Sequence, residues 1–214
     1  MLRLIVRSLV VLLATTGFTL AADPTFTRGY AGFHYNMFDG LDKNPIGIMG
    51  GVEYEIENTD FFATGEYQRL TYKIGDAKVI GNAFVLGGGM KFKPAKVDMF
   101  AKPVVPYGQA GLILASTKVK QDGNSDKSSD NGFMLKGGIR AAITEPSWAD
   151  FYAQFTSVDS ESDISLGAEL TYAVHEKYNA VGFFEFDLDF DRTTIGIMGS
   201  MAIPEFQFNS KPVQ

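Results

Sequence analysis

"IGIMGGVEYEIE", residues 46–57, separates into two sets of side chains when every second residue is taken. One set is Ile46, Ile48, Gly50, Val52, Tyr54 and Ile56, and the other is Gly47, Met49, Gly51, Glu53, Glu55 and Glu57. Successive side chains of a β-strand point to opposite faces, so the stretch predicts a strand with one apolar face and one face that ends in carboxylates. What surrounds each face decides the fold.

The same alternation returns along the rest of the chain. It is regular in "NAFVLGGGMKF" (82–92), "GFMLKGGIRAAI" (132–143), "ISLGAELTYAV" (164–174), "NAVGFFEFDLDF" (179–190) and "TTIGIMGSMAI" (193–203). Less regular segments at 25–38, 60–74, 104–119 and 149–158 bring the expected number of strands to about ten. In the segment 60–74 the apolar residues change face, and we expect a β-bulge between Glu66 and Arg69 to account for this.

Most connections between these segments are short and turn-like, as in "ENTD", "TEPSW" and "VHEKY". The longest is the polar stretch 120–131, "KQDGNSDKSSDN", which we expect to be a mobile loop available to an extracellular ligand. A long run of antiparallel hairpins has two exposed edge strands, and these pair with each other when the sheet closes into a barrel. The sequence therefore predicts an all-β protein that is a single antiparallel up-and-down β-barrel.

The chain begins with the layout of a secretory signal peptide. Arg3 and Arg7 precede a short apolar run that ends in small residues, with Thr19 and Ala21 at the −3 and −1 positions of a cleavage site after Ala21. This run is shorter than the roughly 20 residues that a spanning helix needs. We expect a signal peptide over 1–21, a barrel over 22–204 and a C-terminal tail over 205–214.

Composition excludes several classes of function. Without the two signal-peptide arginines, 17 basic residues stand against 25 acidic ones, a net charge of −8, which argues against a nucleic-acid partner. The chain has no cysteine and only two histidines, His34 and His175, so we expect no disulfide, no metal site and no cofactor.

Two barrels of opposite polarity fit the alternation. A soluble carrier of the lipocalin type turns its apolar face inward, whereas an outer-membrane barrel turns it outward to lipid. Three observations favour the second. The first is that the less apolar face of the last strand carries no charge, although a face exposed to water usually carries several. This face consists of Thr194, Gly196, Met198, Ser200 and Ala202. The second is the length of the apolar faces, which matches the roughly 9–11 residues of a tilted membrane strand.

The third observation is a set of aromatic residues at the strand ends on one side, as in the girdle at a membrane interface. It consists of Tyr54, Phe61, Phe62, Phe92, Tyr107, Trp148, Phe151, Tyr172 and Tyr178. We therefore expect Ile46 to Ile56 to face lipid while Glu53, Glu55 and Glu57 point into the barrel.

Two stretches resemble a known family. "VVPYGQAGLILAS", with Pro106-Tyr107 and Ala110-Gly111 at the start of a strand, resembles the small Gram-negative outer-membrane barrels of the OmpA-like and opacity-protein-like group, and "AAITEPSWADFYAQF" is similar to the hairpins of that group. The resemblance implies insertion by the barrel-insertion machinery and offers eight strands as the alternative to ten. Chains of that group typically end on an aromatic residue, for which Phe206 or Phe208 could stand in here.

The inward face is expected to carry charges of both signs, which pair and fill the lumen because an unpaired buried charge is costly. These residues are Glu53, Glu55, Lys91, Lys136, Arg140, Glu169, Glu185 and Asp187. Asp189 and Asp191 continue the last carboxylate column as an acidic outer rim. No nucleophile or base stands beside an orienting residue, so we expect no catalysis.

The sequence thus predicts an exported outer-membrane barrel with a filled polar lumen and a structural, adhesive or surface-interaction role. Outer-membrane lipid is its expected partner. A small selective, porin-like channel and a soluble periplasmic lipocalin-like carrier remain as alternatives.

Overall fold

Each alternating stretch forms a strand in the computed structural model, which describes residues 26–38, 44–97, 100, 102–144, 146–188 and 192–203. The strands are β1 (Arg28–Phe38), β2 (Ile46–Glu55), β3 (Phe61–Ile74), β4 (Ala77–Lys91), β5 (Val105–Gln121), β6 (Asn124–Thr144), β7 (Ser147–Val158), β8 (Glu161–His175), β9 (Tyr178–Asp187) and β10 (Arg192–Ala202). In the described ranges, no helix is long and apolar enough to cross a membrane.

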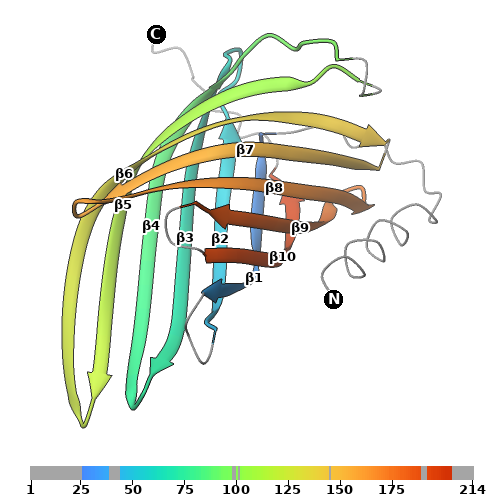
Figure 1. Ribbon diagram of the computed structural model, residues 1–214. Coiled ribbons are helices and arrows are strands. Elements are labelled where there is room, and N and C mark those ends of the chain that lie inside the picture. The colour runs from blue at the N-terminus through green and yellow to red at the C-terminus, as the bar shows by residue number, and fades with distance from the viewer. Residues whose placement is uncertain are drawn as a thin grey trace, which may run out of the picture.

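The strands form one closed antiparallel barrel (Figure 1). Every strand pairs with its neighbours in sequence, and β1 closes the circle by pairing with β10, with Phe33 opposite Ile197. This confirms the predicted all-β, up-and-down barrel of about ten strands. We call the end with the β2–β3, β4–β5, β6–β7 and β8–β9 connections the N-terminal end, and the opposite end the hairpin end.

Large apolar side chains cover the outside of the barrel. Ile197 is 70% exposed and Leu112 is 68% exposed, and Ile46, Ile48 and Val52 of the opening stretch are exposed as well. On the other parity, Glu53 is only 7% exposed. A continuous apolar surface of this kind is stable against hydrocarbon and not against water. This placement is that of a membrane barrel and not of a carrier with an apolar interior.

The predicted loop 120–131 is wrong, because β5 and β6 continue through it as a hairpin. The two strands pair down to Gln121 opposite Asn124 and leave only Asp122 and Gly123 as the turn. Both turn residues have positive φ, 50° and 82°, the backbone shape of the two-residue turn that an Asp-Gly pair favours. Cross-strand pairing thus overrides the low β propensity of a polar segment.

The predicted bulge at Glu66–Arg69 is also wrong. β3 stays in unbroken register with β2 and β4, and shifts occur instead at Ala142/Thr144 and Ala173/His175. Leu70 and Tyr72 simply lie on the inward parity that Phe62 begins, while Arg69 faces outward. At this end of β3 the outer face carries the polar residues Arg69, Thr71 and Lys73 in place of apolar ones.

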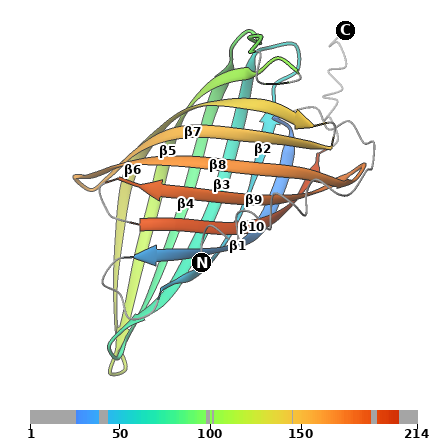
Figure 2. The same ribbon diagram turned by 45° about the vertical axis from the view of Figure 1, so that its right-hand side comes forward.

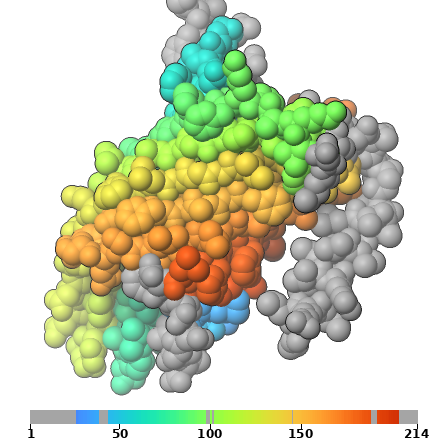
Figure 3. All heavy atoms as spheres, turned by 45° about the horizontal axis from the view of Figure 1, so that its top comes forward, coloured from blue at the N-terminus to red at the C-terminus, as the bar shows by residue number. Residues whose placement is uncertain are grey.

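Strands β3 to β6 run on past the others at the hairpin end (Figures 1 and 2). We call residues 69–82 and 115–131 the β3–β6 extension. Within it β6 pairs with β5 only, because pairing of β6 with β7 begins at Gly132 opposite Val158. In the space-filling view the tips of both hairpins stand clear of the rest of the molecule (Figure 3).

Several predicted features lie outside the described residues. These are the signal peptide 1–21, the C-terminal tail 205–214, and Asp189 and Asp191 of the acidic rim.

Candidate functional site

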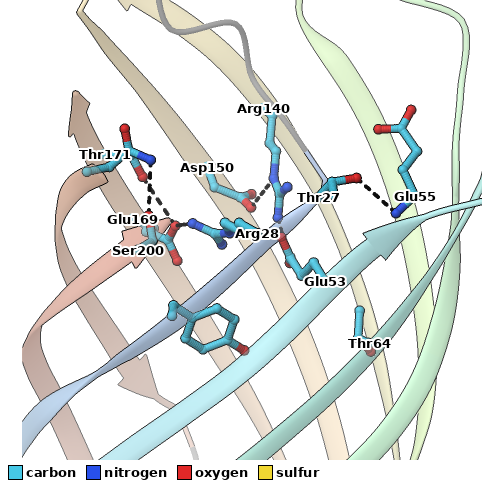
Figure 4. A network of polar contacts seen from close by, with 12 residues as sticks. Thr27, Arg28, Glu53, Glu55, Thr64, Arg140, Asp150, Glu169, Thr171 and Ser200 are labelled. Atoms are coloured by element: carbon cyan, nitrogen blue, oxygen red, sulfur yellow. Dashed lines mark hydrogen bonds and ion pairs between the residues drawn. The ribbon is translucent and has the colours of Figure 1, made fainter. Parts of the chain in front are cut away.

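A chain of buried charges crosses the lumen near the N-terminal end (Figure 4). The Arg140 guanidinium donates to Asp150 and to Glu53, at 2.8 Å in each case. Glu53 also accepts from Arg28 at 2.9 Å, and Arg28 continues to Glu169. Five strands (β1, β2, β6, β7 and β8) each supply one member, and charges of opposite sign alternate along the chain. We call these five residues the charge chain.

Burial in the lumen makes this pairing necessary. Arg140 and Asp150 are each only 1% exposed. A buried ion is tolerated when an opposite charge and hydrogen bonds replace its water, and a chain of alternating signs gives each interior member two such partners.

Aromatic rings pack around the charge chain. Phe26, Phe62 and Tyr107 form a buried cluster with ring centroids 4.7 to 6.2 Å apart. The Arg140 guanidinium carbon lies 3.9 Å from the Phe26 centroid and 5.3 Å from the ring of Trp148. Tyr107 donates to Asp150 at 2.9 Å, which ties the rings to the charges. These side chains therefore occupy the lumen at this level.

These contacts correct the predicted aromatic girdle. Phe62, Tyr107 and Trp148 are buried inside the barrel and do not face lipid. Phe61, Phe92, Phe151 and Tyr178 are exposed, as a girdle requires. Aromatic residues favour strands on either face, so clustering at strand ends does not by itself separate the two.

Inward glycines accommodate the rings. Tyr30 lies opposite Gly51, Tyr152 opposite Gly167, and Phe183 opposite Gly196 on the neighbouring strands. A Cβ at Gly167 would overlap the ring of Tyr152, and one at Gly51 would lie 2.6 Å from the Tyr30 hydroxyl. Each of these inward glycines thus leaves room for the aromatic ring of its partner residue on the neighbouring strand.

A polar chamber of about 110 Å³ lies between the charge chain and the hairpin end. Tyr30 donates to Glu66 at 2.5 Å and Tyr152 donates to Glu185 at 2.9 Å on its wall. The Lys136 ammonium lies 3.7 Å from the Tyr152 centroid. The chamber is small, and most of its polar groups already bind one another.

The structure places all eight predicted lumen residues on the inward parity. Glu53, Arg140 and Glu169 belong to the charge chain, and Lys136 and Glu185 line the chamber. The other three form pairs of their own, in which Glu55 binds Lys91 and Asp187 binds Arg192.

Sequence reasoning missed Arg28, Asp150 and Arg192. Arg28 begins the inward set Arg28, Tyr30, Gly32, His34 and Asn36, and Asp150 lies between inward Trp148 and Tyr152. Alternation within β1 and β7 was the signal that could have identified the first two.

The metal-ligating residue types are not grouped in the described part of the chain. The described residues contain no group of three or more His, Cys, Asp or Glu residues that could hold a metal ion. Nδ1 of His34 lies 3.1 Å from the Asn36 amide, which in turn accepts from Thr194 at 2.9 Å. The His34 ring is thus held by an amide and not by the carboxylate that orients the base of a nucleophile.

Comparisons with solved structures find similar chains at low identity. Neisserial surface protein A is 13% identical with a TM-score of 0.45, covering 83% of this chain and 96% of that one. The β domain of the Bordetella autotransporter BrkA is 14% identical with a TM-score of 0.49, covering 83% and 99%. Ail, the attachment invasion locus protein of Yersinia pestis, is 15% identical with a TM-score of 0.39, covering 83% and 99%.

No curated protein matches the chain. A family model described as the outer membrane protein beta-barrel domain matches residues 8–201, nearly the whole of it. With the closed barrel, its apolar outside and its charged interior, this match assigns the chain to the family of outer-membrane β-barrel domain proteins.

Proposed function

We propose that the protein is a non-conducting outer-membrane barrel that serves a structural, adhesive or interaction role at the surface of a Gram-negative cell, without catalysis. The observation that supports this proposal is the packing of side chains across the lumen. Arg28, Glu53 and Arg140 meet across it, and buried rings fill the space around them. Barrels of about eight strands are filled by side chains, whereas open diffusion pores need about sixteen.

Conductance in planar lipid bilayers tests the closed lumen. The refolded protein is added to the bilayer beside a general diffusion porin that is prepared in the same detergent. We expect the porin to give steps of current and this protein to give none across the same range of voltage. Stable unitary steps from the wild-type protein would overturn the proposal.

A small selective channel is the second candidate, and the polar chamber favours it. The chamber is lined by groups of both signs, among them Glu66, Lys136 and Arg192. Conduction would need Arg28 and Arg140 to leave their carboxylates together. Steps of current that vanish at low voltage and return at high voltage would support this candidate.

The β3–β6 extension supports the surface role. It continues the barrel wall beyond the apolar region as a paired sheet that ends in two tight turns. We place this end outside the cell, where an extracellular ligand would meet residues 120–131. We also propose that residues 1–21 are a signal peptide and that the barrel-insertion machinery inserts the barrel into the membrane.

A shortened hairpin tests the surface role. Residues 118–127 are replaced by Asn-Gly, which can connect Thr117 to its partner Ser128 through a two-residue turn. Cells that produce the wild-type or the shortened protein are compared for self-aggregation and for adhesion to glass. We expect the shortened barrel to fold, with heat-modifiable migration, and to lose adhesion. Unchanged adhesion would contradict a role for this hairpin.

A further inference from the structure

On the strands of the β3–β6 extension, every ionisable residue of the outward parity is positively charged. We call this set the basic face, and it consists of Arg69, Lys73, Lys78, Lys118, Lys120 and Lys127. All six lie on the outward parity, as their pairing shows: Arg69 is opposite Asn82, Lys78 is opposite Lys73 and Lys120, and Lys118 is opposite Lys127. Of the four acids in the extension, Asp126 and Asp130 lie on the inward parity, opposite Val119 and Ala115, and Asp76 and Asp122 lie in the two hairpin turns.

The lysines of this face lie directly opposite one another on neighbouring strands. Lys73, Lys78 and Lys120 lie side by side on three adjacent strands, and Lys118 faces Lys127. Directly opposed like charges destabilise a sheet. In the described part of the chain none of the six forms an ion pair within 4 Å, so the barrel itself does not neutralise them. An anion bound from outside the protein would reduce this repulsion.

The basic face also has a hollow, with a volume of about 380 Å³. Its wall contains Arg69, Lys118, Lys120 and Lys127 together with the hydrogen-bonding groups of Asn82 and Ser116. The Asn82 amide accepts from the Tyr67 hydroxyl at 2.9 Å, which fixes its position. Cations beside an amide and a hydroxyl suit the oxygens of a phosphate group.

The hollow lies directly beyond the lipid-facing surface. Tyr67, Phe84 and Leu114 are the last exposed aromatic or aliphatic side chains below it on β3, β4 and β5. Lys118 follows Leu114 by four residues, or about 13 Å along a strand, and a tilt of about 45° reduces this to roughly 9 Å along the membrane normal. The polar layer on each side of the hydrocarbon is about 5–8 Å thick. Lys118 therefore lies at its outer boundary, and Arg69, two residues beyond Tyr67 and roughly 5 Å along the normal, lies within it.

We propose that the basic face binds the phosphate groups of lipid headgroups in the outer leaflet beside the barrel. The position favours a lipid over a soluble polyanion, because the face continues the lipid-contacting side of the wall and points away from the lumen. Lys73, Lys78 and Lys120 lie further out than Arg69 and Lys118. A headgroup with phosphates at more than one depth therefore fits best, as in a phosphorylated glycolipid. The proposal rests on the placement of the hairpin end outside the cell.

Binding in mixed micelles tests the proposal with a dye on the extension. The chain has no cysteine, so Ser129→Cys, outward and opposite Ser116, provides one attachment point. The full barrel is titrated with a lipid that has a diphosphorylated disaccharide headgroup, and in parallel with phosphatidylcholine. We expect saturable binding of the first lipid that weakens as salt rises, and no binding of the second.

Two triple variants with the same change of charge separate the site from general electrostatics. The first is Arg69→Gln/Lys118→Gln/Lys127→Gln. The second is Lys93→Gln/Lys96→Gln/Lys177→Gln, which removes three exposed lysines at the opposite end of the barrel. At about 1 kcal/mol per cation near an anionic surface, we expect affinity to fall about 100-fold in the first and to stay at the wild-type value in the second.

Equal loss in both triple variants, or in neither, would overturn the proposal. A competition result would also overturn it. If soluble heparin binds the wild type, displaces the lipid and loses affinity in the first triple variant, the site binds a soluble polyanion and not a lipid. If the first triple variant fails to fold, Lys118→Gln and Lys127→Gln alone are each expected to weaken binding about fivefold. Both ends of the barrel are accessible in micelles, so this result does not depend on which end faces the outside of the cell. Labelling of whole cells tests that orientation separately.

Discussion

Arg140 holds the centre of the charge chain at the scale of single residues. It contacts two carboxylates, whereas Asp150 and Glu169 at the ends of the chain each contact one of the two arginines. Removal of Arg140 therefore leaves Asp150 without an arginine partner and leaves Glu53 with Arg28 alone. Removal of one partner from a buried pair is strongly destabilising, because the remaining charge keeps its desolvation cost and loses the attraction that offset it.

We expect Arg140→Met to lower the free energy of unfolding by about 3–5 kcal/mol. Trp148 is the single tryptophan, and its ring lies 5.3 Å from the Arg140 guanidinium carbon, so its fluorescence reports on this part of the lumen. The measurement is urea unfolding of the refolded barrel in phospholipid vesicles. Arg140→Lys should retain part of the stability, since it keeps the charge but cannot bind Asp150 and Glu53 in the same planar arrangement.

Lys136→Met is the matched control for this prediction. Lys136 also points into the lumen from β6, but its described contact is with the ring of Tyr152 and not with a carboxylate. Its removal should cost about 0.5–2 kcal/mol, the range of a cation–π contact. Equal unfolding midpoints for Arg140→Met and Lys136→Met would show that the charge chain does not stabilise the barrel.

Alternation along the sequence was enough to identify Glu53, Arg140 and Glu169 as lumen residues. It could not identify which of them meet. Arg28 and Glu169 are 141 positions apart in the chain, and their contact depends on closure of the barrel and on the register of every strand between them. The local sequence pattern determines whether a side chain points inward or outward. Which inward side chains meet across the lumen depends on the closure and register of the whole sheet.

At the scale of the strand, inward glycines and aromatic rings form matched pairs across neighbouring strands. β10 provides a comparison, because it has a glycine on each parity. A Cβ at inward Gly196 would overlap the Phe183 ring and lie 2.6 Å from the backbone oxygen of Phe33. A Cβ at outward Gly199 would meet nothing within 4 Å. The ring could turn away, but the backbone oxygen is held by the pairing of β1 with β10.

We therefore expect Gly196→Ala to destabilise the barrel by about 1–3 kcal/mol, the usual cost of overpacking, and Gly199→Ala to leave its stability within about 0.5 kcal/mol. Heat-modifiable migration after a urea titration measures the folded fraction of each variant. If both variants unfold at the wild-type urea concentration, Gly196 is not a packing position.

The β5–β6 hairpin shows where the prediction of elements failed. Polar composition over 120–131 indicated a loop, but Asp122-Gly123 was the signal of a two-residue turn between strands. Lys, Ser and Asp alternate there without an apolar face, so the usual period-2 signal was absent. The length of this hairpin comes from pairing between its own two strands and not from burial.

At the scale of the whole molecule, an even number of strands places both ends of the barrel chain on one side of the membrane. Bacterial outer-membrane barrels keep short turns on the periplasmic side and longer segments outside. The two-residue turn of β8–β9 and the protruding β3–β6 extension fit this arrangement, with the hairpin end outside the cell, whereas the long β4–β5 connection, residues 92–104, lies at the N-terminal end. The opposite insertion would place the basic face in the periplasm.

Single cysteines at the two ends distinguish these orientations, because the wild-type chain has none. Ser125→Cys lies at the β5–β6 tip and Glu176→Cys in the β8–β9 turn, and both residues are exposed. A maleimide that does not cross membranes is added to intact cells and then to permeabilised cells, with the cysteine-free wild type as the blank. We expect Ser125→Cys to be labelled in intact cells and Glu176→Cys only after permeabilisation. The reverse order would place the extension inside the envelope and remove the basis for a surface role, whatever the barrel binds in micelles.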